Sequence, residues 1–386
     1  MRGKPSLSKG HAQETPDRVE AIPESRSLID LFAGAGGFSL GFAQAGFSPV
    51  LGVDDDQRAI SAYSANFPGV ATILGDVGEL TGSEMLDSAG VDSCGVVVGG
   101  PPCAAFSMGG FRNADDDRSE LVFEFGRVVR EVGPMYFVME NVPGILVPPF
   151  DAIIERFRSE MRTAGYQVTD PWVLDASDFG VPQRRRRVFL VGAKDGSALP
   201  VEPAAGRESN PTVKDAIGDL ETLEGETPGP DGELTHSAEV VSAYVEQLRR
   251  LFPENGESQH SGVQMKLTGC ARVEHSEDVA KRFESVCPGE ADPVSRFHRL
   301  HPDRTSPTIR AGTLPARGSH TAPRPIHYRF PRCITVREAA RLQSFPDWFL
   351  LDSTKWRGFM QVGNAVPPLL GQAVADSIDR AISQEA

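Results

Sequence analysis

An apolar run, CGVVV at residues 94–98, ends abruptly in two glycines, two prolines and Cys103. β-Branched residues without polar interruption are typical of a strand buried on both faces of a parallel sheet. Glycine and proline stop such a strand, and ligands of open α/β sheets bind where the strands end. Cys103 is therefore a candidate nucleophile at a strand end. A small buried packing residue is the alternative.

Strand and helix patterns alternate on both sides of this run, which predicts an α/β fold with a parallel sheet. The other predicted strands cover residues 27–33, 49–53, 70–74, 135–139, 168–174 and 188–191. The predicted helices cover residues 38–45, 57–66, 120–132, 151–164, 213–220, 240–251, 337–344 and 369–382.

The 386 residues can form one large domain with a second, smaller one. Regular periodicity thins, and glycine, proline and serine rise, between residues 199 and 330. We therefore predict a disordered leader at residues 1–27 and a catalytic domain at residues 28–198. A smaller, irregular domain follows at residues 199–330, and residues 331–386 complete the catalytic domain.

The cysteines argue for a reducing compartment. There are five, an odd number, and no CxxC pair occurs among them. This pattern fits neither a disulfide framework nor a zinc site, so we predict a cytoplasmic protein without a metal. The polar leader lacks the apolar core of a secretion signal, and no apolar run reaches the roughly 20 residues of a membrane span.

Charge is spread unevenly around the net value of −14. Residues 201–292 hold 8 Lys and Arg against 19 Asp and Glu, a net charge of −11. Residues 293–332 hold 8 arginines against Asp303 alone, a net charge of +7. A local basic stripe is typical of phosphate binding, and a solvated loop is the alternative.

Polar residues stand where several predicted strands end. The glycine turn at residues 34–37 suits the approach of a nucleotide cofactor, and Asp54 after the second strand can accept bonds from ribose hydroxyls. Asp76 can reach an adenine amino group. Glu140 comes to the same sheet edge as Cys103, as a general acid, a base-edge partner or a simple cap. Four arginines at 184–187 enter a strand, so alternate side chains must face opposite sides.

Six segments, in order, resemble the motifs of bacterial-type DNA (cytosine-5)-methyltransferases. They are DLFAGAGGF at 30–38, GPPCAAFS at 100–107, ENV at 140–142, QRRRR at 183–187, REAARLQSFP at 337–346 and QVGN at 361–364. The resemblance covers nearly everything from Leu28 onward. It implies a Rossmann-like, S-adenosylmethionine-dependent methyltransferase sheet with a smaller, irregular target-recognition domain.

By this resemblance, the protein transfers a methyl group from S-adenosylmethionine to C5 of a cytosine flipped out of a specific duplex DNA sequence. Cys103 would attack C6 and form a covalent intermediate. Glu140 would hold or protonate N3. Arg187, with Arg185, would bind the O2 side and steady Glu140.

The resemblance also implies two sets of binding residues. The cofactor would contact Asp30, Phe32, Gly34, Gly36, Asp54, Asp76, Pro101, Asn364 and Val366. The DNA substrate would contact Ser107, Asn141, Gln183 and Arg310. Two departures stand out: Ala104-Ala105 where the family has Gln, often followed by Pro, and Asp55 where many relatives have an apolar or aromatic residue.

Other functions remain open at this point. The same motifs occur in a branch that methylates tRNA, a silent DNA-binding relative is conceivable, and a small-molecule methyltransferase is a third alternative. The preferred hypothesis places the protein as a monomer on duplex DNA, at the nucleoid of a bacterial cytoplasm, with a cognate restriction endonuclease as partner.

Overall fold

The computed structural model describes residues 23–102, 120–206, 210–229, 232–237, 241–250, 265–312 and 324–385. Several predictions fall outside these ranges. They concern Cys103, Ser107, the Ala104-Ala105 departure, Arg317 and residues 1–22 of the leader.

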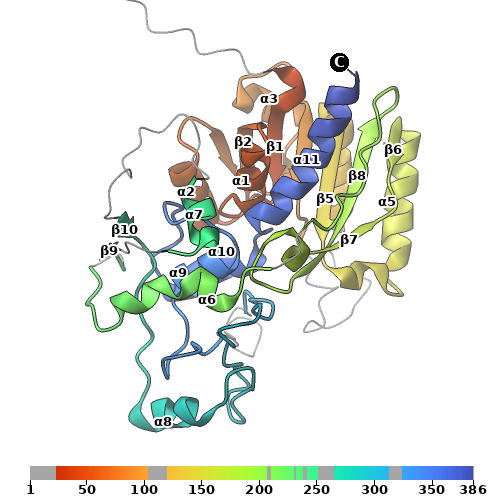
Figure 1. Ribbon diagram of the computed structural model, residues 1–386. Helices are drawn as coiled ribbons and strands as arrows, with labels where there is room; N and C mark the ends of the chain where they lie inside the picture. The colour runs from red at the N-terminus through yellow and green to blue at the C-terminus, as the bar shows by residue number, and fades with distance from the viewer. Residues whose placement is uncertain are drawn as a thin grey trace, which may run out of the picture.

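The centre of the molecule is an eight-stranded sheet in the order β3-β2-β1-β4-β5-β8-β6, with β7 also paired to β8 (Figure 1). Its strands are β1 (Ser27–Leu31), β2 (Ser48–Asp54), β3 (Ala71–Leu74), β4 (Val96–Gly99), β5 (Tyr136–Asn141), β6 (Tyr166–Val168), β7 (Trp172–Asp175) and β8 (Arg186–Lys194). Strands β1 to β5 run parallel, and β8 is antiparallel to its three neighbours. The predicted α/β fold with a largely parallel sheet is confirmed. The chain order reverses between β1 and β4, which is where such sheets bind ligands.

Helices cover both faces of this sheet. One face carries α1 (Gly37–Gln44) and α11 (Pro368–Glu385), and the other carries α3 (Gly82–Ala89), α4 (Glu120–Val132) and α5 (Asp151–Thr163). The other helices of the described residues are α2 (Gln57–Asn66), α6 (Val213–Ile217), α7 (Ala243–Arg250), α8 (Glu277–Ser285), α9 (Val336–Leu342) and α10 (Lys355–Asn364). Among the helices of the described residues, none is long and apolar enough to cross a bilayer.

Side chains of alternate strand residues pack into two separate hydrophobic cores, one on each face of the sheet. Leu28 and Val96 belong to the core that includes α1 and α11, whereas Ile29 and Val97 belong to the core that includes α4 and α5. This alternation follows from the two-residue period of a strand. The strands can be apolar throughout because helices remove both faces from water.

Part of the predicted second domain packs on the main body. Helices α6 and α7 contact each other, and α6 also contacts α9. Val213 and Val245 therefore belong to the same core as α9 and α11. The small cluster of Phe283, Ile326 and Cys333 is separate, and it lies on the side of α8, away from the sheet (Figure 1).

Some element bounds differ from those predicted. The strand predicted at 168–174 is split, because Pro171 between β6 and β7 has no N–H to donate. The helix predicted at 213–220 ends at Ile217 and continues as a 3₁₀ turn at Asp219–Leu223. Helices α3, α8 and α10 were not predicted. For α3 a signal was present, since Thr81 and Glu84 form a capping box at its start.

Helices α1 and α11 approach so closely that Gly41 is required between them. A Cβ on Gly41 would lie 2.5 Å from the carbonyl oxygen of Pro368 and 2.7 Å from the nitrogen of Gln372. We expect Gly41→Ala to lower the free energy of unfolding by about 1–3 kcal/mol, measured by urea denaturation. Gly206→Ala is the control, since its Cβ would meet only the Ala204 carbonyl, at 3.8 Å. Equal stability of the two variants would contradict this packing.

Candidate active site

The turn after β1 uses backbone conformations that favour glycine. Gly34 and Gly36 have φ of 58° and 96°, and Phe32 has φ of 57°. A non-glycine residue in this region is strained, and such strain persists where surrounding structure enforces it. A Cβ on Gly34 would meet no atom within 4 Å, so the turn borders open space at the carboxyl end of β1.

Asp54, the last residue of β2, holds this turn from the neighbouring strand. Its Oδ2 accepts a hydrogen bond from the Gly34 N–H at 2.8 Å, and its Oδ1 accepts one from the Asp56 N–H at 2.9 Å. Burial raises the pKa of Asp54, and these hydrogen bonds oppose the rise. The structure thus places a carboxylate beside the glycine turn, where the ribose acceptor is predicted.

Asp30 lies beneath the turn. It is 1% exposed, and its Oδ2 accepts hydrogen bonds from the Ser39 N–H at 3.2 Å and the Ser39 hydroxyl at 2.6 Å. The Ser39 hydroxyl is also 2.8 Å from the Tyr63 hydroxyl. Burial raises the pKa of Asp30 to about 7. These contacts make Asp30 an anchor for helix α1.

Three other residues predicted at the cofactor come from separate segments. Asp76 is exposed after β3, and its carboxylate accepts from the Gly78 N–H at 2.8 Å. Asn364 is exposed at the end of α10. The carbonyl of Val366 lies against the start of α1, where a Cβ on Gly37 would be 2.7 Å from it. Only glycine therefore permits this approach of the C-terminal segment.

Helix α10 and the segment before it also bind Asp56 and the first turn of α2, through contacts that were not predicted. Arg357 and Asp56 form an ion pair at 3.0 Å, and Arg58 pairs with Asp352 at 2.9 Å. The partners are about 300 residues apart in the chain, since Asp56 and Arg357 differ by 301 positions. No local pattern could have indicated them.

Glu140 and Arg187 form a buried ion pair where β5 ends and β8 begins. The Nε of Arg187 lies 2.6 Å from Oε1 of Glu140, and the two side chains are 12% and 11% exposed. Burial raises the pKa of Glu140, while the positive charges of Arg187 and Arg185 oppose the rise. The site therefore holds a buried carboxyl beside a fixed cation, with burial and the two positive charges acting on its pKa in opposite directions.

The end of β4 lies next to Glu140. A Cβ on Gly100 would be 3.0 Å from Oε2 of Glu140. The side-chain amide of Asn141 donates to the Pro101 carbonyl at 3.3 Å and so fixes the peptide that leads toward Cys103. Cys103 itself is outside the described residues, but the segment that precedes it ends beside Glu140.

The alternation predicted for residues 184–187 is present. Arg184 and Arg186 are exposed, whereas Arg185 is fully buried. Arg185 donates to the carbonyls of Ile309 at 3.0 Å, Gly363 at 2.6 Å and Ala365 at 3.1 Å.

Gln183 is likewise fully buried. Its amide nitrogen donates to Oε1 of Gln343 at 2.6 Å, and its amide oxygen accepts from the Ile309 N–H at 3.0 Å. Both Gln183 and Arg185 therefore contact other parts of the chain in this structure, and their partners lie in the segments before residue 312 and after residue 335.

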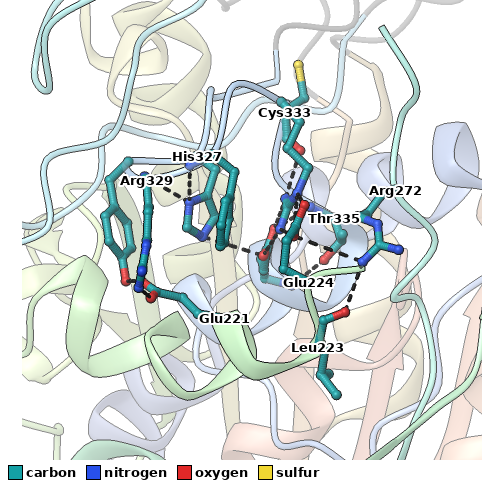
Figure 2. Close-up of polar contacts among 12 residues, drawn as sticks. Glu221, Leu223, Glu224, Arg272, His327, Arg329, Cys333 and Thr335 are labelled. Atoms are coloured by element: carbon teal, nitrogen blue, oxygen red, sulfur yellow. Dashed lines mark hydrogen bonds and ion pairs between the residues drawn. The ribbon is translucent and has the colours of Figure 1, made fainter. Parts of the chain in front are cut away.

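Six of the eight arginines of residues 293–332 divide into two groups. Arg324 stacks over the Phe359 ring, with its guanidinium 4.7 Å from the ring centre, and Arg317 is outside the described residues. Arg299 donates to backbone carbonyls, Arg329 pairs with Glu221, and Arg332 pairs with Glu224 and Glu338, as Figure 2 shows for several of these contacts. The acidic surplus of the preceding stretch thus neutralises part of the stripe internally. The other group is exposed, and comprises Arg296, Arg304 and Arg310.

We expect the buried carboxyl of Asp30 to make stability depend on pH. Below about pH 4 the Asp30 carboxyl is protonated in both the folded and the unfolded protein. As the pH rises to about 7, only the unfolded protein loses this proton, which lowers the free energy of unfolding. The free energy of unfolding of the wild type should therefore fall by a few kcal/mol over this pH range relative to that of Asp30→Asn, whose amide oxygen can still accept from Ser39. Urea denaturation at several pH values measures this. Asp87→Asn, on the surface of α3, is the control, and parallel wild-type and Asp30→Asn curves would contradict the assignment.

Known proteins share this arrangement over most of the chain. A model of the family "C-5 cytosine-specific DNA methylase" matches residues 26–380. The type II methyltransferase M.XorII of Xanthomonas oryzae pv. oryzae is 44% identical, with 92% of this chain and 85% of that protein covered. M1.HphI of Haemophilus parahaemolyticus, also a type II methyltransferase, is 36% identical, with 92% and 87% covered.

Solved structures agree. An E. coli prophage-encoded protein described as a DNA modification methyltransferase superposes with a TM-score of 0.80 at 33% identity, covering 92% of this chain and 99% of that one. The Dnmt2 methyltransferase of S. pombe, with a TM-score of 0.55 and 17% identity over 93% and 99% of the chains, shares the fold. The predicted methyltransferase sheet is confirmed. The chain therefore belongs to the C-5 cytosine-specific DNA methylase family, as a type II DNA (cytosine-5)-methyltransferase that uses S-adenosylmethionine.

Proposed function

We propose that Cys103 attacks C6 of a cytosine flipped out of duplex DNA while Glu140 and Arg187 bind that base. The buried ion pair of Glu140 and Arg187 carries this proposal, with 2.6 Å between Oε1 and Nε. It lies at the sheet edge where the chain runs from β4 into Cys103. A base inside the helix cannot reach such a site, so the cytosine must leave the stack.

The residues divide the chemistry among them. The Cys103 thiolate forms a bond to C6 as the C5–C6 π bond breaks. Its electrons form a C4–C5 π bond, and the C4–N3 π electrons pass to N3, which takes a proton, so that C5 becomes the nucleophilic carbon of an enamine. Glu140 holds or supplies a proton at N3, a role favoured by the burial that raises its pKa. Arg187 binds the O2 side of the base. Loss of the C5 proton then expels the Cys103 thiolate and restores the aromatic ring.

The residues around β1 fit the cofactor. The open space beside Gly34 and the carboxylate of Asp54 suit a nucleoside with polar substituents. We infer that Phe32, Gly34, Gly36 and Asp54 hold it, with the other predicted residues at its rim. When bound, S-adenosylmethionine supplies an electrophilic methyl group.

Several predicted contact residues are better assigned to positioning. The side chains of Gln183, Arg185 and Asn141 bind the protein itself. We propose that they fix Arg187 and the approach to Cys103, rather than touch the base. Asp30 similarly positions the cofactor turn through Ser39. Ser107 and the exposed Arg310 stay candidates for DNA contact.

We also propose the context in which the protein acts. Residues 199–330 would recognise the DNA site, and the protein would work as a monomer on duplex DNA at the nucleoid of a bacterial cytoplasm. A restriction endonuclease would share its site. The bacterial type II relatives support this context.

Duplex DNA containing 5-fluorocytosine tests the covalent step. Fluorine at C5 cannot leave as a proton does, so the wild type, given S-adenosylmethionine, should form an adduct that survives denaturation. Cys103→Ser should form none. Sequencing of pooled adducts gives the recognised site. No adduct on diverse duplexes, or an adduct only on RNA carrying the same analogue, would contradict the proposal.

Substitutions of Arg185 and Arg187 should have different effects, the first on stability and the second on adduct formation. Arg185→Met removes the guanidinium that donates to the buried Ile309 and Gly363 carbonyls, so we expect a loss of about 3 kcal/mol of unfolding free energy. The Ala365 carbonyl keeps a donor, the amide of Gln343 at 2.8 Å. Arg187→Met should abolish adduct formation at a smaller cost, because Glu140 can take up a proton when its partner is removed. Urea denaturation and the 5-fluorocytosine adduct measure both effects. Equal destabilisation by the two changes would contradict this division of roles.

A further inference from the structure

Arg184 and Arg304 line a cavity of about 520 Å³ that the proposed chemistry does not use. His298, His301 and Thr305 line it too, together with Gly289. We propose that this groove, called here the phosphate groove, binds one backbone phosphate of the substrate DNA. The inference rests on the proposed function and adds to it a contact that positions the duplex, independent of its sequence.

The two arginines differ from the rest of their stripe. Arg299, Arg329 and Arg332 satisfy their guanidinium groups within the protein. Both Arg184 and Arg304 are exposed, and within the described ranges neither has a carboxylate partner. Guanidinium groups without a carboxylate partner, at the rim of a concave surface, suit an anion with two acceptor oxygens, such as a phosphodiester.

Two side chains converge on one wall of the groove. Nη1 of Arg304 and Cδ2 of His301 each lie 3.8 Å from the point where a Cβ on Gly289 would stand. Nδ1 of His301 accepts a hydrogen bond from the Asp303 N–H at 3.2 Å. The neutral ring therefore carries its proton on Nε2, beside Cδ2, where it can donate to a phosphate oxygen.

Backbone hydrogen bonds fix the position of Arg184. The N–H of Arg184 donates to the Ser306 carbonyl at 2.9 Å, and the Thr308 hydroxyl donates to the Arg184 carbonyl at 2.6 Å. Arg184 is thereby held against the segment that carries Arg304. A phosphate between the two arginines would be bound by groups that need little rearrangement, which reduces the entropy lost on binding.

The groove is close enough to the reacting base to act on the same duplex. Arg184 precedes Arg187 by three residues, at most about 10 Å of extended chain. Duplex DNA rises about 3.4 Å per base pair, so this span corresponds to about three base pairs. The phosphate bound there would flank the flipped cytosine and set the position of the duplex over Glu140.

Salt dependence of DNA binding tests the groove. We would measure the affinity for a labelled 25-base-pair duplex of arbitrary sequence between about 50 and 300 mM KCl, with Arg184→Gln, Arg304→Gln and the wild type. Loss of one phosphate contact should lower the slope of log affinity against log salt by about 1. We expect each variant to bind about tenfold more weakly at low salt. Arg162→Gln, which removes an exposed arginine from α5, should match the wild type.

Slopes of both variants parallel to the wild type would overturn the proposal. A second arm titrates inorganic phosphate at constant ionic strength. We expect no specific displacement of the duplex, whereas displacement that depends on Arg184 and Arg304 would assign the groove to free phosphate and also overturn it. Unchanged binding of S-adenosylmethionine shows that the variants are folded.

The 5-fluorocytosine adduct separates this inference from the proposed function. At saturating duplex, both variants should still form the adduct, because Cys103, Glu140 and Arg187 are intact. Unchanged salt slopes with normal adducts would refute the groove alone. Slopes lowered in the two variants relative to the wild type, with no adduct from any of the three proteins, would refute the chemistry alone.

Discussion

The buried guanidinium of Arg185 joins three parts of the chain that are remote in sequence. It donates to carbonyls of Ile309, Gly363 and Ala365, and the first two lie 124 and 178 positions away. Burying a charged group is costly unless its hydrogen bonds are made, so the three segments must be in place together. The sheet, the segment before residue 312 and the end of α10 are thereby held in one arrangement, and this arrangement sets the geometry of the Glu140–Arg187 pair.

Neighbouring side chains of residues 183–187 face different parts of the structure and have different roles. Gln183 and Arg185 point inward and connect the body of the protein, Arg187 turns to Glu140, and Arg184 reaches the outer groove. The period of an extended chain makes this possible, because neighbouring side chains face opposite sides. A run of four arginines thus contains a buried structural residue, a residue paired with Glu140 and two exposed residues.

Local sequence patterns predicted the helices and strands well, but they did not predict the long-range hydrogen bonds of residues such as Arg185. Helices at 57–66 and 120–132 have the predicted bounds because their amphipathic periodicity and capping are local. Pro171 splits a predicted strand, and the capping box of α3 was overlooked. Glu140 was expected at the correct sheet edge because strands of one sheet end together. The inward role of Arg185 could not be predicted, since its acceptors are backbone atoms that only the folded chain brings near.

The ends of the described chain meet on one side of the sheet. Arg26, just before β1, forms an ion pair with Asp379 in α11, and its guanidinium lies 5.6 Å from the centre of the Phe47 ring. Entry to the first strand and exit from the last helix are therefore adjacent. A short linker from the end of α11 to residue 23 would close residues 23–385 into a ring, and new ends could be opened at the exposed turn around Gly196. The architecture is thus suited to circular permutation, which would separate the order of synthesis from the order of assembly.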